Sequence, residues 1–365
     1  MNMEVIRDFH PVGQGAFYTE VFLGDDGSRF VVVYDCGTET ADDAMDIKLD
    51  DQIKRFAKSL SPYNTIDILF ISHFHADHIS GIKALLSTFK VKKTVIPMLD
   101  VPTLTVTRVQ NFMRFSAAMA ESADQIIQEL YFTDRKSEHF GEITVVAPEI
   151  EGEQTDEDGG AFILNGTKVL SGSKLFYKDI WEYIPFNSIE KNDPRAIALR
   201  NGLVDLSNNL GLAVFDLYAL LRDHLDEVRD EYKAAMKNAN DNLYSLVVVS
   251  QPVAGVVPQL CPRLAHGIYF GDFDCYQKNK PWDRLNKVIQ FSELGTVQVP
   301  HHGARGNWHG EMGKGDPRHY IVSSGSTNCH HHPNFWVLQE IWEDGHRIFV
   351  VSEKWNSETI YCFDI

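Results

Sequence analysis

The sequence predicts an α/β fold, because several short apolar runs end in polar residues and are followed by segments with helical spacing. Three of these runs lead directly into side chains that can bind metals: residues 66–71, 267–270 and 296–299. Short β-branched runs are typical of strands that are covered on both faces, and helices supply that cover. We therefore expect a layered fold in which several strand ends contribute to one site.

The first junction carries four candidate metal ligands within six residues, His73, His75, Asp77 and His78. Imidazole and carboxylate groups are good ligands for zinc, manganese or iron. Alternation along an extended chain points His73 and His75 the same way, whereas Asp77 and His78 fall at the start of the next helix. They can point at a second place in the same cavity, so two neighbouring metal ions are possible.

Two later junctions complete the candidate site. An apolar strand delivers Asp272 through a glycine, and its two oxygens can each take one ion. Asp274 is the alternative ligand. The run over 296–299 leads to His301, which we expect to close the second metal site, and to His302, which we expect to line the pocket.

Three consecutive histidines, residues 330–332, follow a strand predicted over 320–323. They either line the pocket or belong to a polar loop that caps the helix predicted over 335–343. Cys329 lies beside them and is a further possible ligand, although an isolated cysteine is usually a small core residue. His332 is our candidate for a substrate contact.

The order His-x-His-x-Asp-His directly after an apolar strand resembles the signature of the metallo-β-lactamase superfamily. The resemblance implies an αββα sandwich, and it implies that Asp35 braces the histidine loop. It also implies a third first-site histidine between that loop and Asp272. Only His139, His224 and His266 lie in this interval; His224 and His266 lack the expected context, and His139 is a marginal candidate.

Within that superfamily, the chain is similar to the hydrolase domain of bacterial competence (DNA-uptake, ComEC-type) proteins. The similarity covers residues 10–100 and 240–355 and rests on five motifs: residues 13–15, 244–248, 271–272, 299–303 and 332–333. This branch places Asn or Ser at the third first-site position, which implies Asn242 or Ser245 here. The first site is then expected to hold its metal weakly.

We expect residues 1–365 to form a single metallo-β-lactamase-fold domain. Within it, residues 161–240 are predicted to be a largely helical insertion that acts as a cap or as a partner-binding segment. The other elements that we expect are a hairpin over 12–23 and 28–35, strands over 92–98, 143–148, 181–186, 244–249 and 348–351, and a helix over 108–130.

Composition limits the functional classes. The chain has 365 residues and a formal net charge of −17, which weakens the case for a broad basic face that binds nucleic acid. We expected the helices of the insertion to hold much of this acidic excess. The 5 cysteines form no Cys-x-x-Cys pair, and no leader or membrane-length apolar stretch is evident, so we expect a cytoplasmic protein with reduced thiols and no membrane contact.

The function that fits these residues is a metal-dependent hydrolase, a phosphodiesterase or nuclease that cleaves DNA or RNA through a metal-bound hydroxide. Two divalent metal ions are expected, zinc first, with manganese or magnesium as alternatives. Arg305, His302 and His332 are expected to contact substrate phosphates, while Asp77 and Asp272 hold the metals. The alternatives are hydrolysis of a small ester, thioester or lactone, or a non-catalytic module of a multi-protein system.

Overall fold

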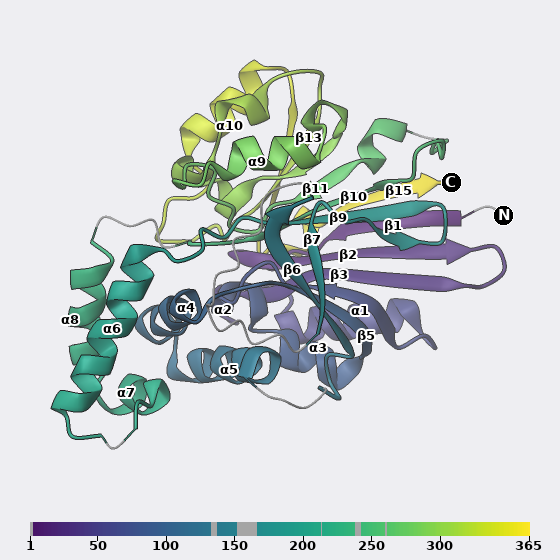
Figure 1. Ribbon diagram of the computed structural model, residues 1–365. Coiled ribbons are helices and arrows are strands. Elements are labelled where there is room, and N and C mark those ends of the chain that lie inside the picture. Colours follow the sequence, from purple (N-terminus) through teal and green to yellow (C-terminus); the bar gives the residue numbers. More distant parts are fainter. Residues whose placement is uncertain (1–2, 133–136, 152–165, 213, 238–241, 260) are drawn as a thin grey trace.

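Two sheets pack face to face in the computed structural model, and helices cover both outer faces (Figure 1). The structure describes residues 3–132, 137–151, 166–212, 214–237, 242–259 and 261–365. The layers therefore run helix, sheet, sheet, helix. The αββα sandwich expected from the sequence is confirmed.

The first sheet carries the histidine loop at the end of its fourth strand in chain order. Its eight strands lie in the order β15 (Thr359–Asp364), β1 (Met3–Phe9), β2 (Gly15–Gly24), β3 (Arg29–Thr38), β4 (Thr65–Phe70), β5 (Lys90–Pro97), β6 (Glu142–Ile150) and β7 (Thr167–Ser171). From β3 to β7 the neighbours are parallel. Their carboxyl ends therefore meet at one edge of the sheet, which is where parallel sheets place their sites.

The second sheet carries Asp272 and the later histidines. Its seven strands lie in the order β14 (Arg347–Val351), β13 (His319–Ser323), β12 (Thr296–Gln298), β11 (Gly267–Tyr269), β10 (Leu246–Pro252), β9 (Trp181–Asn187) and β8 (Leu175–Tyr177). The predicted hairpin and the strands expected at 66–71, 92–98, 143–148, 181–186, 244–249, 267–270, 296–299, 320–323 and 348–351 are thus confirmed within a few residues.

Helices cover the outer faces of both sheets. The first sheet is covered by α1 (Leu49–Leu60), α2 (Ala76–Ile79), α3 (Ile82–Thr88), α4 (Val101–Arg114) and α5 (Ala117–Ile127). The second is covered by α9 (Pro281–Val288) and α10 (Phe335–Glu343). Three further helices, α6 (Pro194–Asn209), α7 (Leu217–Asp223) and α8 (Leu225–Ala235), pack beside α4.

One helix that we predicted is two. The apolar spacing over 108–130 is continuous, but Phe115 is extended, with φ −105° and ψ 168°, and Ser116 accepts a hydrogen bond from the Met119 amide as the N-cap of α5. Serine is a preferred N-cap because its short side chain satisfies an amide that the helix leaves unpaired. A break at a cap does not disturb the apolar period, so periodicity alone missed it. We also expected this helical segment to end near Asp134, which lies outside the described residues.

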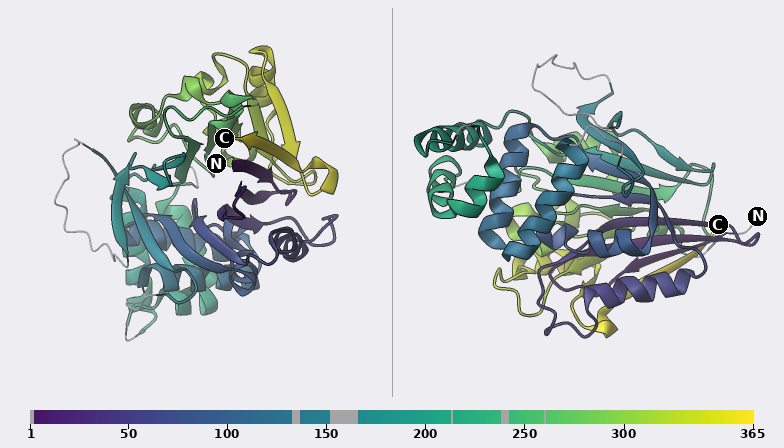
Figure 2. Two further views of the ribbon diagram at one scale, coloured as in Figure 1. Left: turned by 90° about the vertical axis from the view of Figure 1, so that its right-hand side faces the viewer. Right: turned by 90° about the horizontal axis from the view of Figure 1, so that it is seen from below.

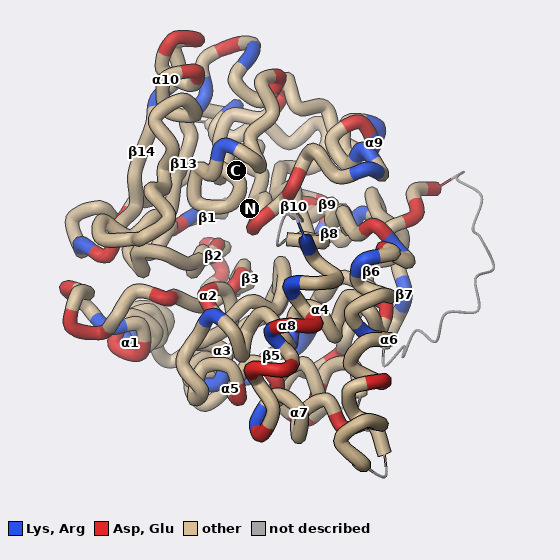
Figure 3. Tube along the Cα trace, turned by 90° about the vertical axis from the view of Figure 1, so that its left-hand side faces the viewer, with Lys and Arg blue, Asp and Glu red and all other residues tan. Residues whose placement is uncertain are grey.

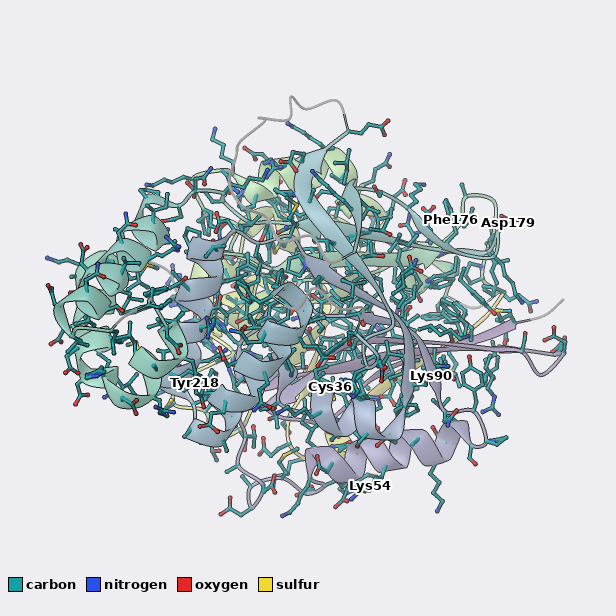
Figure 4. All side chains as sticks on the ribbon, turned by 60° about the horizontal axis from the view of Figure 1, so that its bottom comes forward. Cys36, Lys54, Lys90, Phe176, Asp179 and Tyr218 are labelled. Atoms are coloured by element: carbon teal, nitrogen blue, oxygen red, sulfur yellow. The ribbon has the colours of Figure 1, made fainter. Side chains whose placement is uncertain are left out.

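The predicted insertion is only partly separate from the sheets. Strand β7 pairs with β6 in the first sheet, and β9 pairs with β10 in the second, so the strands between residues 167 and 187 belong to the sandwich. The helical part begins at Pro194. Tyr218 of α7 donates to Glu121 of α5 at 3.4 Å, which ties the helices to the sandwich (Figure 4). The role of this segment as a cap stays a prediction.

The helices of this segment do not hold the acidic excess, contrary to our expectation. Residues 161–240 contain 11 acidic and 10 basic residues, a net charge of −1 out of −17. Basic and acidic positions are mixed over α5 to α8 in Figure 3. A larger share comes from residues 149–158, which hold six acidic and no basic residues.

The two ends of the described chain lie side by side (Figure 2), because β15 pairs with β1 in antiparallel register. Residues 3, 5, 7 and 9 of β1 face the interior, and one of them is Arg7. An inward arginine interrupts the apolar alternation that marks a strand, which explains why β1 was not predicted. No helix among the described residues is long and apolar enough to cross a membrane.

The inward Arg7 is paired within a polar network that joins the sheets. Its guanidinium donates to Glu20 Oε1 at 2.7 Å and to the Ala265 carbonyl at 2.9 Å. Glu20 also accepts from the hydroxyls of Tyr183 and Tyr269, each at 2.7 Å. Arg7 is fully buried and Glu20 is 2% exposed. Arg7 and Glu20 belong to the first sheet, and Tyr183 and Tyr269 belong to the second. The network therefore fixes how the two sheets face each other.

We predict that Arg7→Met lowers the free energy of unfolding by about 3–5 kcal/mol, because it leaves the Glu20 carboxylate buried without its cation. Urea denaturation followed by circular dichroism measures the change. The double variant Arg7→Met, Glu20→Leu should recover part of the loss, since it removes both charges. A single variant as stable as the parent would contradict this account.

Candidate metal centre

Asp35 of β3 holds the histidine loop, residues 73–78, in place. Its Oδ1 accepts from the Ser72 amide at 2.7 Å, and its Oδ2 accepts from the Ser72 hydroxyl at 2.5 Å. Oδ2 also lies 2.9 Å from His78 Nδ1. Asp35 is fully buried, with φ 56°. The carboxylate therefore fixes both the start of the loop and one of its imidazoles.

These contacts decide which nitrogen of each ring is left for a ligand. Nδ1–H of His78 donates to Asp35, and Nδ1–H of His73 donates to the Ser72 hydroxyl at 2.9 Å. The Nε2 atoms of both rings are buried and have no hydrogen-bond partner among the described residues. A metal-ligating histidine usually donates its other ring N–H in this way.

His75 presents its other nitrogen. Its Nε2 lies 2.9 Å from Gln110 Oε1 on α4, and Gln110 Nε2 donates to the Tyr232 hydroxyl on α8 at 3.0 Å. The amide oxygen accepts from Nε2–H, so the Nδ1 lone pair of His75 is directed toward the cavity. Tyr232 lies in the helical segment that we predicted as a cap. That segment therefore reaches a candidate ligand through two hydrogen bonds.

Asp272 is the residue that the two candidate clusters share. His73, His75 and Asp272 form one cluster, and Asp77, His78, Asp272 and His302 form the other, each with its ligand atoms within 4.8 Å of one another. His73 Nε2 lies 3.5 Å from Oδ2 of Asp272, whereas His78 Nε2 lies 3.2 Å from Oδ1. Each oxygen thus faces one cluster.

Glycine is needed just before Asp272. Gly271 has φ 55°, and a Cβ there would lie 2.5 Å from Ser245 Oγ. The amides of Phe270 and Gly271 both donate to Gln298 Oε1, at 2.6 and 2.9 Å. The end of β11 is therefore turned sharply and held by its neighbour β12, which points the carboxylate at the histidine loop. Asp274, the alternative, accepts from the Tyr276 amide and is in neither cluster.

We expected His301 in the second metal site and His302 in the pocket lining, but the structure places His302 in the second cluster. His302 joins the second cluster: its Nδ1–H donates to the Ser323 carbonyl at 2.8 Å, and its Nε2 lies 3.4 Å from Asp77 Oδ2. His301 Nε2 instead lies 3.6 Å from Asp272 Oδ2, on the side of the first cluster. Both residues have left-handed φ values, 46° and 54°. This turn separates adjacent rings in a way that a strand pattern cannot predict.

The interval between the loop and Asp272 supplies an asparagine. Asn242 Nδ2 lies 3.0 Å from Asp272 Oδ2 and 3.0 Å from His301 Nδ1, and its Oδ1 is buried without a partner in the described part of the chain. Ser245 instead donates to the Phe270 carbonyl at 2.8 Å. The three histidines of that interval line no part of the cavity: His139, His224 and His266.

The donor set fits divalent cations. Four side-chain atoms of the two clusters are buried without hydrogen-bond partners in the described residues: His73 Nε2, His78 Nε2, Asp77 Oδ1 and Asp272 Oδ1. An unpaired buried polar atom is costly, so their convergence indicates a ligand. Imidazole and carboxylate together suit zinc or manganese.

A cavity of about 660 Å³ opens above the clusters. Most of the residues that line it are polar, and they include Arg114, which the sequence did not single out because it ends a helix predicted to continue. The described residues that line it are Gln14, Glu39, Thr40, Ala41, His75, Asp77, Arg114, Phe115, Asp272, His301, His302, Gly325, Thr327, Asn328, Cys329, His330 and His332.

Arg305, which we expected in the pocket, is not part of its lining. It is exposed, and its guanidinium lies 5.6 Å from the centre of the Trp336 ring. Of the three histidines over 330–332, His330 and His332 line the cavity and His331 does not. Burial and the neighbouring His301 lower the pKa of His332 to about 3, so it is neutral at pH 7.

Glu39 is the acidic group on the cavity wall outside the clusters. Burial, followed by the charge of Asp77, raises the pKa of Glu39 to about 7. Its Oε1 lies 3.6 Å from His330 Nε2. A carboxyl group that holds its proton near neutral pH can supply that proton to a reacting oxygen.

Residues 19–174, which include the histidine loop, match the model of the metallo-beta-lactamase superfamily. This segment of the chain is therefore similar to the metallo-beta-lactamase superfamily. That superfamily is largely hydrolytic and its members bind divalent metals, and His73, His75, Asp77 and His78 of the two clusters lie in the matched segment. No curated protein matches the sequence.

Several solved structures are similar at low identity. The yeast long-form RNase Z is 11% identical with a TM-score of 0.35, over 89% of this chain and 36% of that one. YhfI, a metallo-beta-lactamase fold protein from Bacillus subtilis, is 11% identical with a TM-score of 0.38, over 99% and 100%. Unliganded yeast PDE1 is 11% identical with a TM-score of 0.40, over 100% of both chains. This chain thus spans about a third of the length of the yeast RNase Z.

Gln110→Leu should weaken metal binding by about 10- to 100-fold, because His75 loses the acceptor that fixes its ring. Zinc titration with a competing chelator measures the affinity. Tyr232→Phe is the matched control, since it keeps the bond between Gln110 and His75, and we expect a smaller loss. Equal affinities for Gln110→Leu and the parent would contradict this role.

Metal binding should release a proton at pH 7. Burial lowers the pKa of His78, but the carboxylates of Asp77 and Asp272 outweigh it and raise that pKa well above its ordinary value. The metal-free ring is therefore protonated, and a cation must displace the proton, so affinity should rise with pH below the raised pKa. Calorimetry in two buffers with different ionisation heats counts the protons. Identical heats in both buffers would show that none is released.

Proposed function

We propose that the protein is a metal-dependent phosphodiester hydrolase that acts on nucleic acid. The observation that carries the proposal is the shared carboxylate, whose two oxygens face two separate clusters. When bound, two divalent cations would supply Lewis-acid stabilisation of the attacked phosphoryl group and a water of lowered pKa. Zinc fits the donors best, and manganese or magnesium are the alternatives.

Two sets of residues would hold the two divalent cations. His73, His75 and Asp272 would hold one ion, with His301 or Asn242 completing its shell beside Oδ2. Asp77, His78, Asp272 and His302 would hold the other. On this proposal the first site binds its metal more strongly than the sequence implied, because His301 offers an imidazole beside Asp272 Oδ2.

The cavity walls favour phosphate over an acyl group. Arg114 in the cavity lining can donate to phosphate oxygens, and His330 can add a further donor. An ester, thioester or lactone hydrolase would need an apolar pocket for the acyl chain, and few apolar side chains line this cavity. Glu39 would give its proton to the leaving oxygen. Asp77 and Asp272 would hold the metal ions beside the reacting phosphate.

Nucleic acid is supported by the similarity of the strand-end motifs to the hydrolase domain of competence proteins. The net charge of −17 opposes a broad contact with duplex. A single strand or a dinucleotide can place one phosphate at a time in the cavity. Such a substrate agrees with the motif similarity and needs no broad basic surface. The helices α6 to α8 are the proposed surface for a protein partner, and a cytoplasmic site of action belongs to the same proposal.

Asp272→Asn should lower kcat by orders of magnitude, because it removes the charge shared by both clusters. Arg114→Ala should raise KM by about tenfold and change kcat less, since a charged contact to substrate is lost. Initial rates are measured with zinc, manganese or magnesium on single-stranded DNA, duplex DNA, RNA and cyclic dinucleotides.

Arg305→Ala is the matched control for Arg114→Ala, because Arg305 stacks on Trp336 outside the cavity and its loss should leave KM unchanged. A lactone and a thioester complete the panel. Efficient cleavage of either of these, with every phosphodiester left intact, would replace the proposal by an acyl hydrolase. Metal uptake without any turnover would favour a non-catalytic module.

A further inference from the structure

A second group of metal-binding side chains lies on the outer face of the first sheet, away from the shared carboxylate. Asp8 of β1, His10 just after it and Glu358 just before β15 place one ligand atom each within 4.8 Å of the others. They line a cavity of about 290 Å³ that α1 covers. None of these residues belongs to the superfamily motif, and the proposed hydrolysis does not use them.

His10 is oriented as a ligand. Its Nε2 lies 3.0 Å from the Thr19 hydroxyl, which can accept an N–H from Nε2 and so leave the Nδ1 lone pair for a metal ion. Nδ1 lies 3.6 Å from Asp8 Oδ2 and 3.5 Å from Glu358 Oε1. These separations are too long for good hydrogen bonds, but ligands about 2.1 Å from a tetrahedral ion lie about 3.4 Å apart.

Two further acceptors in this cavity lack a partner in the described residues, Asp8 Oδ1 and Gln52 Oε1. Gln52 is 2% exposed. Its amide nitrogen donates to the carbonyls of Pro11 and Ile47, at 2.8 and 3.4 Å, so the amide orientation is fixed and the oxygen is the atom left over. A buried, unpaired acceptor that lines the same cavity as two carboxylates favours a cation over an anion.

We propose that Asp8, His10 and Glu358 bind one divalent cation of the zinc or manganese class, with Gln52 Oε1 as a candidate fourth ligand. Arg55 donates to Glu358 Oε2 at 2.7 Å, which holds that carboxylate and leaves Oε1 for the ion. Arg29, also in the lining, donates to the Leu60 carbonyl. The rival arrangement is a protonated His10 paired with both carboxylates and no metal.

Such an ion would join three parts of the fold. Asp8 and His10 belong to the amino-terminal strand and its extension, Glu358 precedes the carboxyl-terminal strand, and Gln52 lies on α1. A cation that binds only the folded chain raises the midpoint of unfolding in proportion to the logarithm of its concentration. The site would thus stabilise the end of the first sheet.

The test uses the full chain with Asp77→Asn and Asp272→Asn, which remove carboxylates from the catalytic clusters and not from this one. The variant is stripped with chelator, supplied with zinc or manganese, and dialysed before its metal content and thermal unfolding are measured. We expect one retained ion per chain and a rise in Tm. No retained ion in a chain with native circular dichroism would overturn the proposal.

Adding His10→Gln to that background should abolish the retained ion and the rise in Tm. His139→Gln is the matched control, because His139 also lies against a carboxylate, 3.0 Å from Glu129, but in no cluster, and we expect it to keep the ion. If His10→Gln destabilises the fold, Glu358→Gln gives the second reading. If His10→Gln and Glu358→Gln both retained the ion, the assignment would be wrong. Loss of the ion from the control His139→Gln would also overturn it.

Discussion

The shared carboxylate of Asp272 is the constraint on which the rest of the site depends. A buried carboxylate is stable only with hydrogen bonds or cations around it, and four imidazoles and a second carboxylate lie within reach of its two oxygens. Each imidazole of the two clusters is held through its other nitrogen, by Ser72, Gln110, Asp35 and Ser323. The ligand atoms are therefore positioned by the fold before any ion binds.

That arrangement requires the two sheets to keep a fixed relation. The histidine loop leaves the first sheet and Asp272 leaves the second, so a small slip between the sheets would separate them. The network around Arg7 and Glu20 crosses the same interface with directional bonds to β9, β10 and β11. An apolar interface alone has no such directionality, which is why a buried ion pair is tolerated there.

The helical segment is joined to a candidate metal ligand. Tyr232 of α8 is linked to His75 through Gln110, so a movement of α8 would change how the His75 ring is held. A partner bound to α6, α7 or α8 has a physical route to the metal centre in these two hydrogen bonds. The strands at the start of the segment, in contrast, are fixed in both sheets.

The sequence by itself determined the local features: the strands that lead to His73, Asp272 and His301, the layered α/β class and, through the resemblance of its motif to a known superfamily, Asp35 as the brace of the histidine loop. These follow from runs of apolar residues and from the motif, which are properties of neighbouring positions. It could not place Arg7, because an inward charge hides a strand until its partner Glu20 is known.

Only the tertiary structure decided which ring of His301 and His302 faces which cluster, since two left-handed residues set that direction. It also decided that Arg114 and not Arg305 lines the cavity, and that Asn242 meets Asp272. Those outcomes depend on contacts between chain segments far apart in sequence, and the local spacing of apolar residues cannot predict such contacts.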